Sequence, residues 1–243
     1  MNPKEYGRMF ELEEHYWWFV GRRNLALRLL RRHLSAPDPL ILDLGCGTGV
    51  VSRELAKQAN VVSLDMSDLA LGYCADRGLT RRVKGDAEHL PFVGSTFDAA
   101  VALDLFEHVE HDRAAFGEAA RVLKPGGMLV LSVPAFRSLW GPHDVALMHH
   151  RRYRLAEVRD RLAEAGLRPL RLSYSVFFLF PAVVTLRMFE KRKKGPPEAQ
   201  LVRVAPWMNR GLMGLQGLEA AMIEKMRLPW GSSIVAAARK EPS

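Results

Sequence analysis

From about residue 38 onward, the chain alternates short apolar runs with stretches in which apolar residues recur every three or four positions. Short apolar runs predict buried strands, and the longer amphipathic stretches predict helices. The predicted strands are LILDLG, NVVSLD, TRRVKGD, FDAAVALD and GGMLVLSVP, and the helices between them include VVSRELAKQ, SDLALGYCADRG and RAAFGEAARVLK. Strands alternating with helices form crossover units, so we expect an α/β fold with a doubly wound parallel sheet that binds ligands at the carboxyl ends of its strands.

The segments outside this alternation predict additions to the core. LRPLRLSY and SSIVAAARK read as a final pair of strands, with apolar and basic chain between them. We therefore divide the chain into a helical N-terminal cap (1–36), the core (37–174), a helical apolar and basic insertion that is the candidate substrate lobe (175–230), and a final core strand with a tail (231–243).

Composition narrows the class of protein. The chain has 243 residues, 48% of them hydrophobic, which is enough for one substantial core. Its two cysteines, Cys46 and Cys74, are too few for a disulfide framework, and the charged first residues lack the apolar segment of a signal peptide. We expect a reduced, cytoplasmic protein.

Charge is distributed unevenly between the two halves of the chain. Residues 1–150 hold 17 Lys and Arg against 19 Asp and Glu, a net charge of −2, whereas residues 151–243 hold 18 against 8, a net charge of +10. The basic half is expected to face an anionic partner, with a solvated arginine-rich surface as the alternative. We expect no nucleic-acid partner, because no recognition motif or stripe of basic and stacking aromatic residues is present.

The turn after LILDL carries glycines at alternate positions, Gly45, Gly47 and Gly49. Such a turn lets the backbone approach a ligand closely. A dinucleotide fingerprint needs glycine or alanine at position 50, where this chain has valine, and Asp43 would repel a pyrophosphate. A ligand with a positively charged amino-acid end fits better, which favours S-adenosylmethionine over NAD.

Two further acids follow the next strands. Asp65 ends NVVSLD about 20 residues after the first glycine, where a carboxylate can accept both ribose hydroxyls of either cofactor. Asp86, in GDAEHLPF, is placed to accept the exocyclic amine of adenine.

The blocks ILDLGCGTG, VVSLDMS, GDAEHLPF, FDAAVALDLFEHV and RVLKPGGMLVLSVP, in this order and spacing, resemble the class I S-adenosylmethionine-dependent methyltransferases. The resemblance covers about residues 38–135 closely and the terminal strand pair more loosely. It implies a seven-stranded, mostly parallel sheet with an antiparallel last strand. Matched by position, it implies that Asp43 and the Gly45–Cys46–Gly47 and Gly49 backbone hold the methionine end, Asp65 the ribose, Met66, Asp86 and Ala87 the adenine, and Leu103 and Asp104 the region of the sulfonium.

Such a cofactor carries an activated methyl group and leaves as a neutral thioether. The protein therefore has to align an acceptor in line behind the methyl group and exclude water. A hydroxyl acceptor would gain from a general base, whereas an ionised or carbanionic acceptor needs none.

DLFEHVEHD, after the fourth predicted strand, is the first place for such a base, with Glu107, His108 and His111. Some quinone-pathway O-methyltransferases have a similar Glu-His pair linked to a divalent metal. We expect no metal here, and we interpret His108 as a catalytic candidate or a residue that lines the pocket floor.

WGPHDVALMHHRRYR, residues 140–154, is the second place. Arginine side chains clamp carboxylates or phosphates, and a histidine serves as a base near neutral pH. The alternative is a surface loop tied to the sheet by its own hydrogen bonds. Our candidates are His143 and Tyr153 for catalysis, and Trp140, His149, His150, Arg151 and Arg152 for binding the acceptor.

Two apolar segments indicate the character of the acceptor. SVFFLFPAVVTL is too short to span a bilayer and contains Pro181. Three alternatives are left: it lies on an anionic membrane together with the basic run 191–194, it covers an apolar tunnel, or it caps the sheet. Near the amino end, Trp17 and Trp18 either wall the active site or staple the first helix to the core, and we expect Trp18 to contact the acceptor.

Together these features predict methyl transfer from S-adenosylmethionine to a small or lipid-linked acceptor with an acidic group, at the inner face of the membrane if the insertion meets lipid. The alternative is a non-catalytic cofactor-binding or membrane-associated protein that retains the fold.

Overall fold

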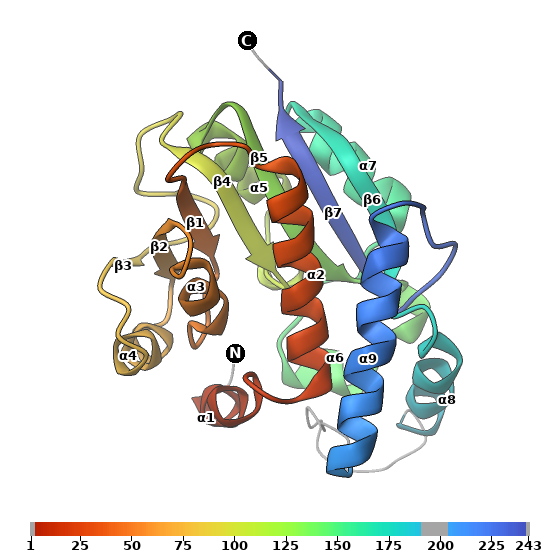
Figure 1. Cartoon of the computed structure of the whole chain (residues 1–243). Coiled ribbons are helices and arrows are strands. Elements are labelled where there is room, and N and C mark those ends of the chain that lie inside the picture. Colours follow the sequence, from red (N-terminus) through yellow and green to blue (C-terminus); the bar gives the residue numbers. More distant parts are fainter. Residues whose placement is uncertain (1–2, 191–203, 242–243) are drawn as a thin grey trace.

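The computed structural model describes residues 3–190 and 204–241, and a seven-stranded sheet lies at its centre (Figure 1). The strands follow the order β3-β2-β1-β4-β5-β7-β6. Their bounds are β1 (Leu40–Leu44), β2 (Asn60–Asp65), β3 (Arg82–Lys84), β4 (Phe97–Leu103), β5 (Leu123–Pro134), β6 (Leu167–Ser175) and β7 (Ser233–Lys240). The predicted α/β fold is confirmed, including the terminal strand pair.

The directions of the strands bring the carboxyl ends of four of them to one edge of the sheet. β1 pairs in parallel with β2 and with β4, and β4 pairs in parallel with β5. β7 is antiparallel to both of its neighbours, β5 and β6. The carboxyl ends of β2, β1, β4 and β5 therefore follow one another along one edge of the sheet, where a doubly wound fold binds its ligands.

Helices cover both faces of the sheet. In Figure 1, α2 and α9 lie in front of the sheet, and α5 and α7 lie behind it. The helices are α1 (Pro3–Leu12), α2 (Trp17–His33), α3 (Val50–Leu55), α4 (Asp68–Asp76), α5 (Asp112–Val122), α6 (Pro142–Ala146), α7 (Leu155–Glu164), α8 (Phe180–Glu190) and α9 (Pro206–Ile223), with short 3₁₀ turns η1 (Phe106–His108) and η2 (Arg137–Leu139).

β4 is buried on both faces of the sheet, which explains why its sequence is almost wholly apolar. Ala99, Val101 and Leu103 face the core under α2 and α9, whereas Ala100 and Ala102 face the core under α5 and α7. Because successive side chains of a strand point to opposite faces, a strand buried on both faces has no polar alternation.

The amino-terminal cap and the insertion pack against each other. α2 and α9 run side by side, and the Trp17 amide donates a hydrogen bond of 2.9 Å to Asn209 Oδ1. Gly21 makes close packing possible, because a Cβ atom there would overlap the Gln216 side-chain amide. The fourfold division of the chain remains an interpretation, since these two segments share one interface.

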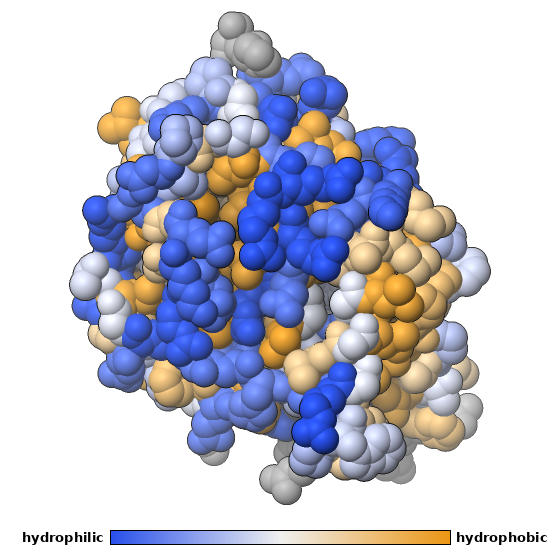
Figure 2. All heavy atoms as spheres, viewed as in Figure 1, coloured by the Kyte–Doolittle hydropathy of each residue, from blue (hydrophilic) through white to orange (hydrophobic). Residues whose placement is uncertain are grey.

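α8 is the least buried apolar helix of the described chain. It has no buried residue, and Leu186, Met188 and Phe189 are exposed. Figure 2 shows hydrophobic surface gathered over α9 and toward α8. Among the described residues, no helix is both long and apolar enough to cross a bilayer. The basic run 191–194 lies outside the described residues.

Candidate functional site

The glycine turn joins β1 to α3 in a left-handed backbone conformation. Gly45, Gly47 and Gly49 have φ values of 71°, 55° and 87°. The Gly45 and Cys46 amides donate hydrogen bonds of 2.8 and 2.9 Å to the Leu64 carbonyl of β2. A Cβ atom at Gly49 would lie 2.8 Å from Cys74 Sγ, so α4 packs directly against this position. The turn is thus held by β2 on one side and α4 on the other.

Asp43 lies buried at the end of β1, 2% exposed. Its Oδ2 accepts a hydrogen bond of 2.6 Å from Ser52 Oγ, and Ser52 Oγ in turn accepts one of 2.7 Å from Ser63 Oγ. Burial raises the pKa of Asp43 to about 7, against the opposing effect of the Ser52 bonds. A carboxyl held in this way is readily ionised by a cation placed beside it.

Asp65 closes the turn from the neighbouring strand. Its Oδ2 accepts a hydrogen bond of 3.0 Å from the Gly47 amide, and its Oδ1 accepts one of 2.9 Å from the Ser67 amide. Burial raises the pKa of Asp65, and the hydrogen bonds from these backbone amides oppose that effect. The next residue, Met66, is 68% exposed, so its thioether is free to lie against a ligand.

Asp86 and Ala87 lie in the loop between β3 and β4. Asp86 is exposed and accepts a hydrogen bond of 2.9 Å from the Glu88 amide, whereas Ala87 is buried. Cys46 is buried in the glycine turn, with its Sγ 3.6 Å from that of Cys74, and neither cysteine forms a disulfide.

Leu103 ends β4, and Asp104 follows with a φ of 52°, a strained value for a residue other than glycine. Ser132 Oγ, from β5, donates a hydrogen bond of 2.7 Å to Asp104 Oδ1. Arg22, from α2, forms an ion pair with Asp104 Oδ2. Sequence reasoning missed Arg22, because nothing in its arginine-rich segment distinguishes it from its neighbours.

α1 covers the glycine turn, which the sequence did not predict. The Tyr6 hydroxyl is buried beside Asp65 and hydrogen-bonds with the side chain of Ser67. Just after α1, the Glu13 carboxylate accepts hydrogen bonds from Thr48 Oγ1 and from Arg77, the latter at 2.8 Å. The amino-terminal segment is therefore bonded to the predicted cofactor site itself.

Much of the polar loop 140–154 is tied together around the buried Asp144. Arg152 Nε donates a hydrogen bond of 2.7 Å to Asp144 Oδ1, and His149 Nδ1 lies 2.9 Å from the same oxygen. Burial opposes ionisation of Asp144, but His149 and Arg152 lower its pKa below the usual value. Burial lowers the pKa of the partly buried His143 to about 3. His149 and Arg152 thus have internal partners.

The other predicted residues of this loop are placed differently. Arg151 pairs with Asp112 and donates a hydrogen bond to a backbone carbonyl, whereas Trp140 is partly buried and His150 exposed. The buried Tyr153 hydroxyl lies 3.1 Å from both the Phe106 carbonyl oxygen and Asp112 Oδ2. Burial raises the pKa of Tyr153. These contacts match the alternative of a loop bound by its own interactions, and the catalytic and acceptor-binding roles stay predictions.

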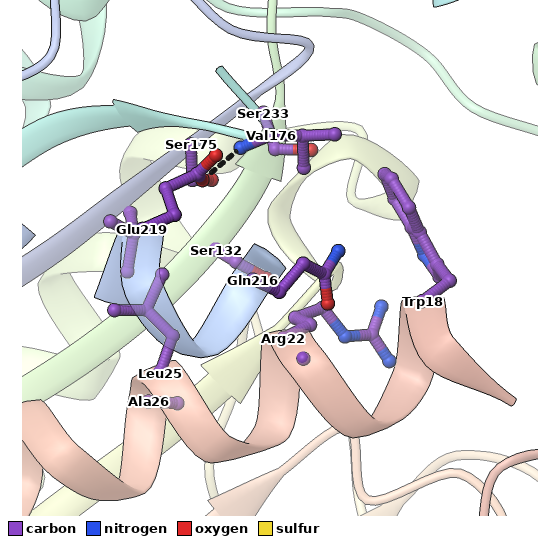
Figure 3. Close-up of a pocket in the computed structure, with 12 residues that line it drawn as sticks. Trp18, Arg22, Leu25, Ala26, Ser132, Ser175, Val176, Gln216, Glu219 and Ser233 are labelled. Carbon is purple, nitrogen blue, oxygen red and sulfur yellow. Dashed lines mark hydrogen bonds between the residues drawn. The ribbon is translucent and has the colours of Figure 1, made fainter. Parts of the chain in front are cut away.

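A pocket adjoins Asp104 at the same edge of the sheet, between α2 and α9 (Figure 3). Trp18 and Arg22 enter it from α2, and Gln216 and Glu219 from α9. Its floor is the end of the sheet, where β5, β6 and β7 contribute Ser132, Ser175, Ser233 and Val235.

The polar groups of this pocket fall into two kinds. Glu219 is fully engaged, because its carboxylate accepts hydrogen bonds of 2.5 and 2.7 Å from the Val176 and Phe177 amides. Arg22 Nε and Gln216 Oε1 are buried with no hydrogen-bond partner among the described residues. A donor and an acceptor thus stand ready for a polar ligand group. Sequence reasoning missed this pocket, and Glu219, an acid among mostly apolar residues of α9, is a signal that could have found it.

Comparison with known proteins relates part of this chain to a family. A family model described as a methyltransferase domain matches residues 42–131, which run from β1 through most of β5. The chain is 36% identical over 101 residues to sterol 24-C-methyltransferase erg6 of Schizosaccharomyces pombe, covering 38% of this chain and 27% of that protein. It is 32% identical over 149 residues to demethylmenaquinone methyltransferase of Corynebacterium glutamicum, covering 58% of this chain and 64% of that protein.

The chain therefore spans less than two thirds of the length of either curated relative. Among solved structures, phosphoethanolamine N-methyltransferase 2 of Haemonchus contortus, in complex with S-adenosylmethionine, superposes with a TM-score of 0.59 at 18% identity. The match covers 90% of this chain and 52% of that one, and it supports the fold alone. Residues 42–131 therefore match a methyltransferase domain, in agreement with the family resemblance found in the sequence.

Proposed function

We propose that this chain transfers the methyl group of S-adenosylmethionine to a small or lipid-linked acceptor that carries an acidic group. One observation carries the proposal: Asp43, Asp65 and Asp104 lie at or just after the carboxyl ends of three adjacent strands around the glycine turn. Three carboxylates suit a ligand with an ammonium group, ribose hydroxyls and a sulfonium, and they would repel a pyrophosphate. The match to a methyltransferase domain over the same strands supports the assignment.

The bound cofactor would supply an activated methyl group. In this proposal Asp43 and the turn backbone hold its amino-acid end, Asp65 holds the ribose hydroxyls, and Met66, Asp86 and Ala87 contact the adenine. Leu103 and Asp104 lie beside the sulfonium. α1 and the Trp17–Trp18 segment exclude water, which strengthens every electrostatic contact at the site.

We propose that the acceptor binds between α2 and α9, where the pocket of about 30 Å³ has to widen to admit more than a small group. Arg22 reaches it with an unpaired Nε, and Gln216 Oε1 is also unpaired. A guanidinium favours an acidic acceptor group, and the walls from Trp18 and Leu25 favour an apolar body. The names of the curated relatives, a sterol and a demethylmenaquinone methyltransferase, support an apolar acceptor.

His143, His108 and Tyr153 remain our candidates for a base. Burial lowers the pKa of both histidines to about 3, so each imidazole is neutral at pH 7 and holds a transferred proton weakly. An acceptor that arrives ionised therefore fits this site better than a neutral hydroxyl.

A radiolabelled methyl assay on fractionated cell extract tests the activity. We expect purified protein to label a low-molecular-weight or lipid fraction, and Asp65→Asn to abolish the labelling. Cofactor binding without label in any fraction would favour the alternative, a non-catalytic protein that retains the fold.

We also propose that α8 and α9 bring the protein into peripheral contact with an anionic membrane at the inner face, in the cytoplasm. The exposed Leu186 and Phe189 on α8 and Trp207 on α9 support this contact. The double variant Leu186→Glu, Phe189→Glu should reduce sedimentation with anionic vesicles. The control is Val93→Glu, which changes an exposed apolar residue outside α8 and α9 and should leave sedimentation unchanged. Equal sedimentation of both variants would contradict the proposal.

A further inference from the structure

Three potential metal ligands meet beside the end of β4. Glu107 and His108 lie in η1, and His149 comes from the loop after α6. One ligand atom from each of these side chains lies within 4.8 Å of those of the other two. The rings of His108 and His149 meet edge to face, with centroids 4.6 Å apart. Residues 41 positions apart are thus brought together by the fold.

Glu107 is the unusual member of this cluster. Its side chain is buried, 1% exposed, and its Oε2 has no hydrogen-bond partner among the described residues. A buried carboxyl oxygen without a partner costs free energy on folding, so such groups are rare unless they serve a ligand. Arg22 pairs with Asp104 and Arg152 with Asp144, so neither guanidinium is bonded to Glu107.

His149 is held as a metal-binding histidine is held. Its Nδ1 lies 2.9 Å from Asp144 Oδ1, so Nε2 is the ring nitrogen that Asp144 does not engage. Asp144 is itself fixed, because it accepts hydrogen bonds of 2.7 Å from Arg152 Nε and 2.9 Å from the Gly141 amide. A carboxylate behind a histidine in this way orients the ring and strengthens it as a ligand.

We propose that Glu107, His108 and His149 bind one divalent transition-metal ion, with zinc as the type. Two imidazoles and one carboxylate favour zinc, cobalt or iron over magnesium and calcium, which prefer oxygen ligands. Metal–ligand bonds of about 2.0–2.2 Å require the three donors to approach one another by side-chain rotation. Three protein ligands leave a coordination position open. The site departs from our expectation of no metal, and it stands independently of the proposed methyl transfer.

Calorimetric titration with zinc tests the site. The titrated protein is the whole chain without a histidine tag, after dialysis against a chelator. We expect one zinc ion per chain and no displacement by millimolar magnesium. Glu107→Gln and His149→Ala should each weaken zinc binding at least tenfold, and Asp144→Asn should weaken it roughly 10–100-fold, as losing a supporting carboxylate does. The control is His111→Ala, because His111 is 71% exposed in its side chain and bonded to Glu88.

Absence of stoichiometric zinc binding to the folded wild-type chain would overturn the proposal. So would wild-type affinity in both Glu107→Gln and His149→Ala. Circular dichroism shows whether His149→Ala folds, and if it does not, Glu107→Gln decides, because glutamine keeps the size of the side chain while weakening it as a ligand.

Discussion

Asp43 gives the sharpest test of the electrostatics at the glycine turn, through the change Asp43→Asn. Burial raises the pKa of this carboxyl from the usual 3.8 to about 7 in the folded chain. Between these two values the folded state binds a proton that the unfolded state has lost. The free energy of unfolding therefore falls as pH rises through this window, and the loss is complete above about pH 7.

The magnitude follows from the two pKa values. Each factor of ten in proton affinity is worth about 1.36 kcal/mol, so ionised Asp43 costs the folded state roughly 4 kcal/mol. Asparagine keeps the shape and does not ionise. Asp43→Asn should therefore gain about 3–4 kcal/mol of stability relative to the wild type between about pH 4 and pH 8.

Urea unfolding followed by circular dichroism at each pH measures this difference. Asp160→Asn is the control. The Asp160 side chain, on α7, is 54% exposed, so this substitution removes no buried charge. A stability difference between Asp43→Asn and the wild type that stays constant with pH would refute the reasoning. So would an equal pH dependence in the control.

Three further changes probe packing and hydrogen bonding. Gly49→Ala places a Cβ atom 2.8 Å from Cys74 Sγ at a φ of 87°, so it should lower the free energy of unfolding by about 2–4 kcal/mol. Its control is Gly217→Ala on α9, where a Cβ atom meets open space and should raise the free energy of unfolding by about 0.5–1 kcal/mol. Gly21→Ala should displace the Gln216 amide, and a double-mutant cycle with Gln216→Ala should show a coupling energy of about 0.5–1.5 kcal/mol; additive effects would contradict this contact. Glu219→Ala leaves the Val176 and Phe177 amides without a hydrogen-bond acceptor and should lower the free energy of unfolding, measured in urea, by about 2–5 kcal/mol. A loss below about 1 kcal/mol would show that water replaces the carboxylate.

The sequence was sufficient for the sheet and the glycine turn because both depend on local patterns. Apolar runs of strand length predicted β1, β2, β4 and β5. Alternate glycines predicted a turn whose backbone can approach a ligand closely, and all three glycines have positive φ values. Asp43 and Asp65 were found for the same reason, because each lies at the carboxyl end of a predicted strand.

The rest depends on contacts between distant residues. Arg22 becomes distinctive only when α2 crosses the sheet and brings it to Asp104, 82 positions away. The Trp17 bond to Asn209 spans 192 positions, and no periodicity within either helix predicts it. In the loop 140–154, the residue types suggested a binding site, whereas Asp144 is the buried centre that engages His149 and Arg152.

The central claim is that S-adenosylmethionine binds at the glycine turn between Asp43 and Asp65. Calorimetric titration of the purified chain with S-adenosylhomocysteine, the product of methyl transfer, tests it most directly, with Asp65→Asn and NADH in parallel. The account predicts one-to-one binding that Asp65→Asn weakens at least tenfold, or about 1.4 kcal/mol, and no comparable affinity for NADH. Tight NADH binding without affinity for S-adenosylhomocysteine would contradict it.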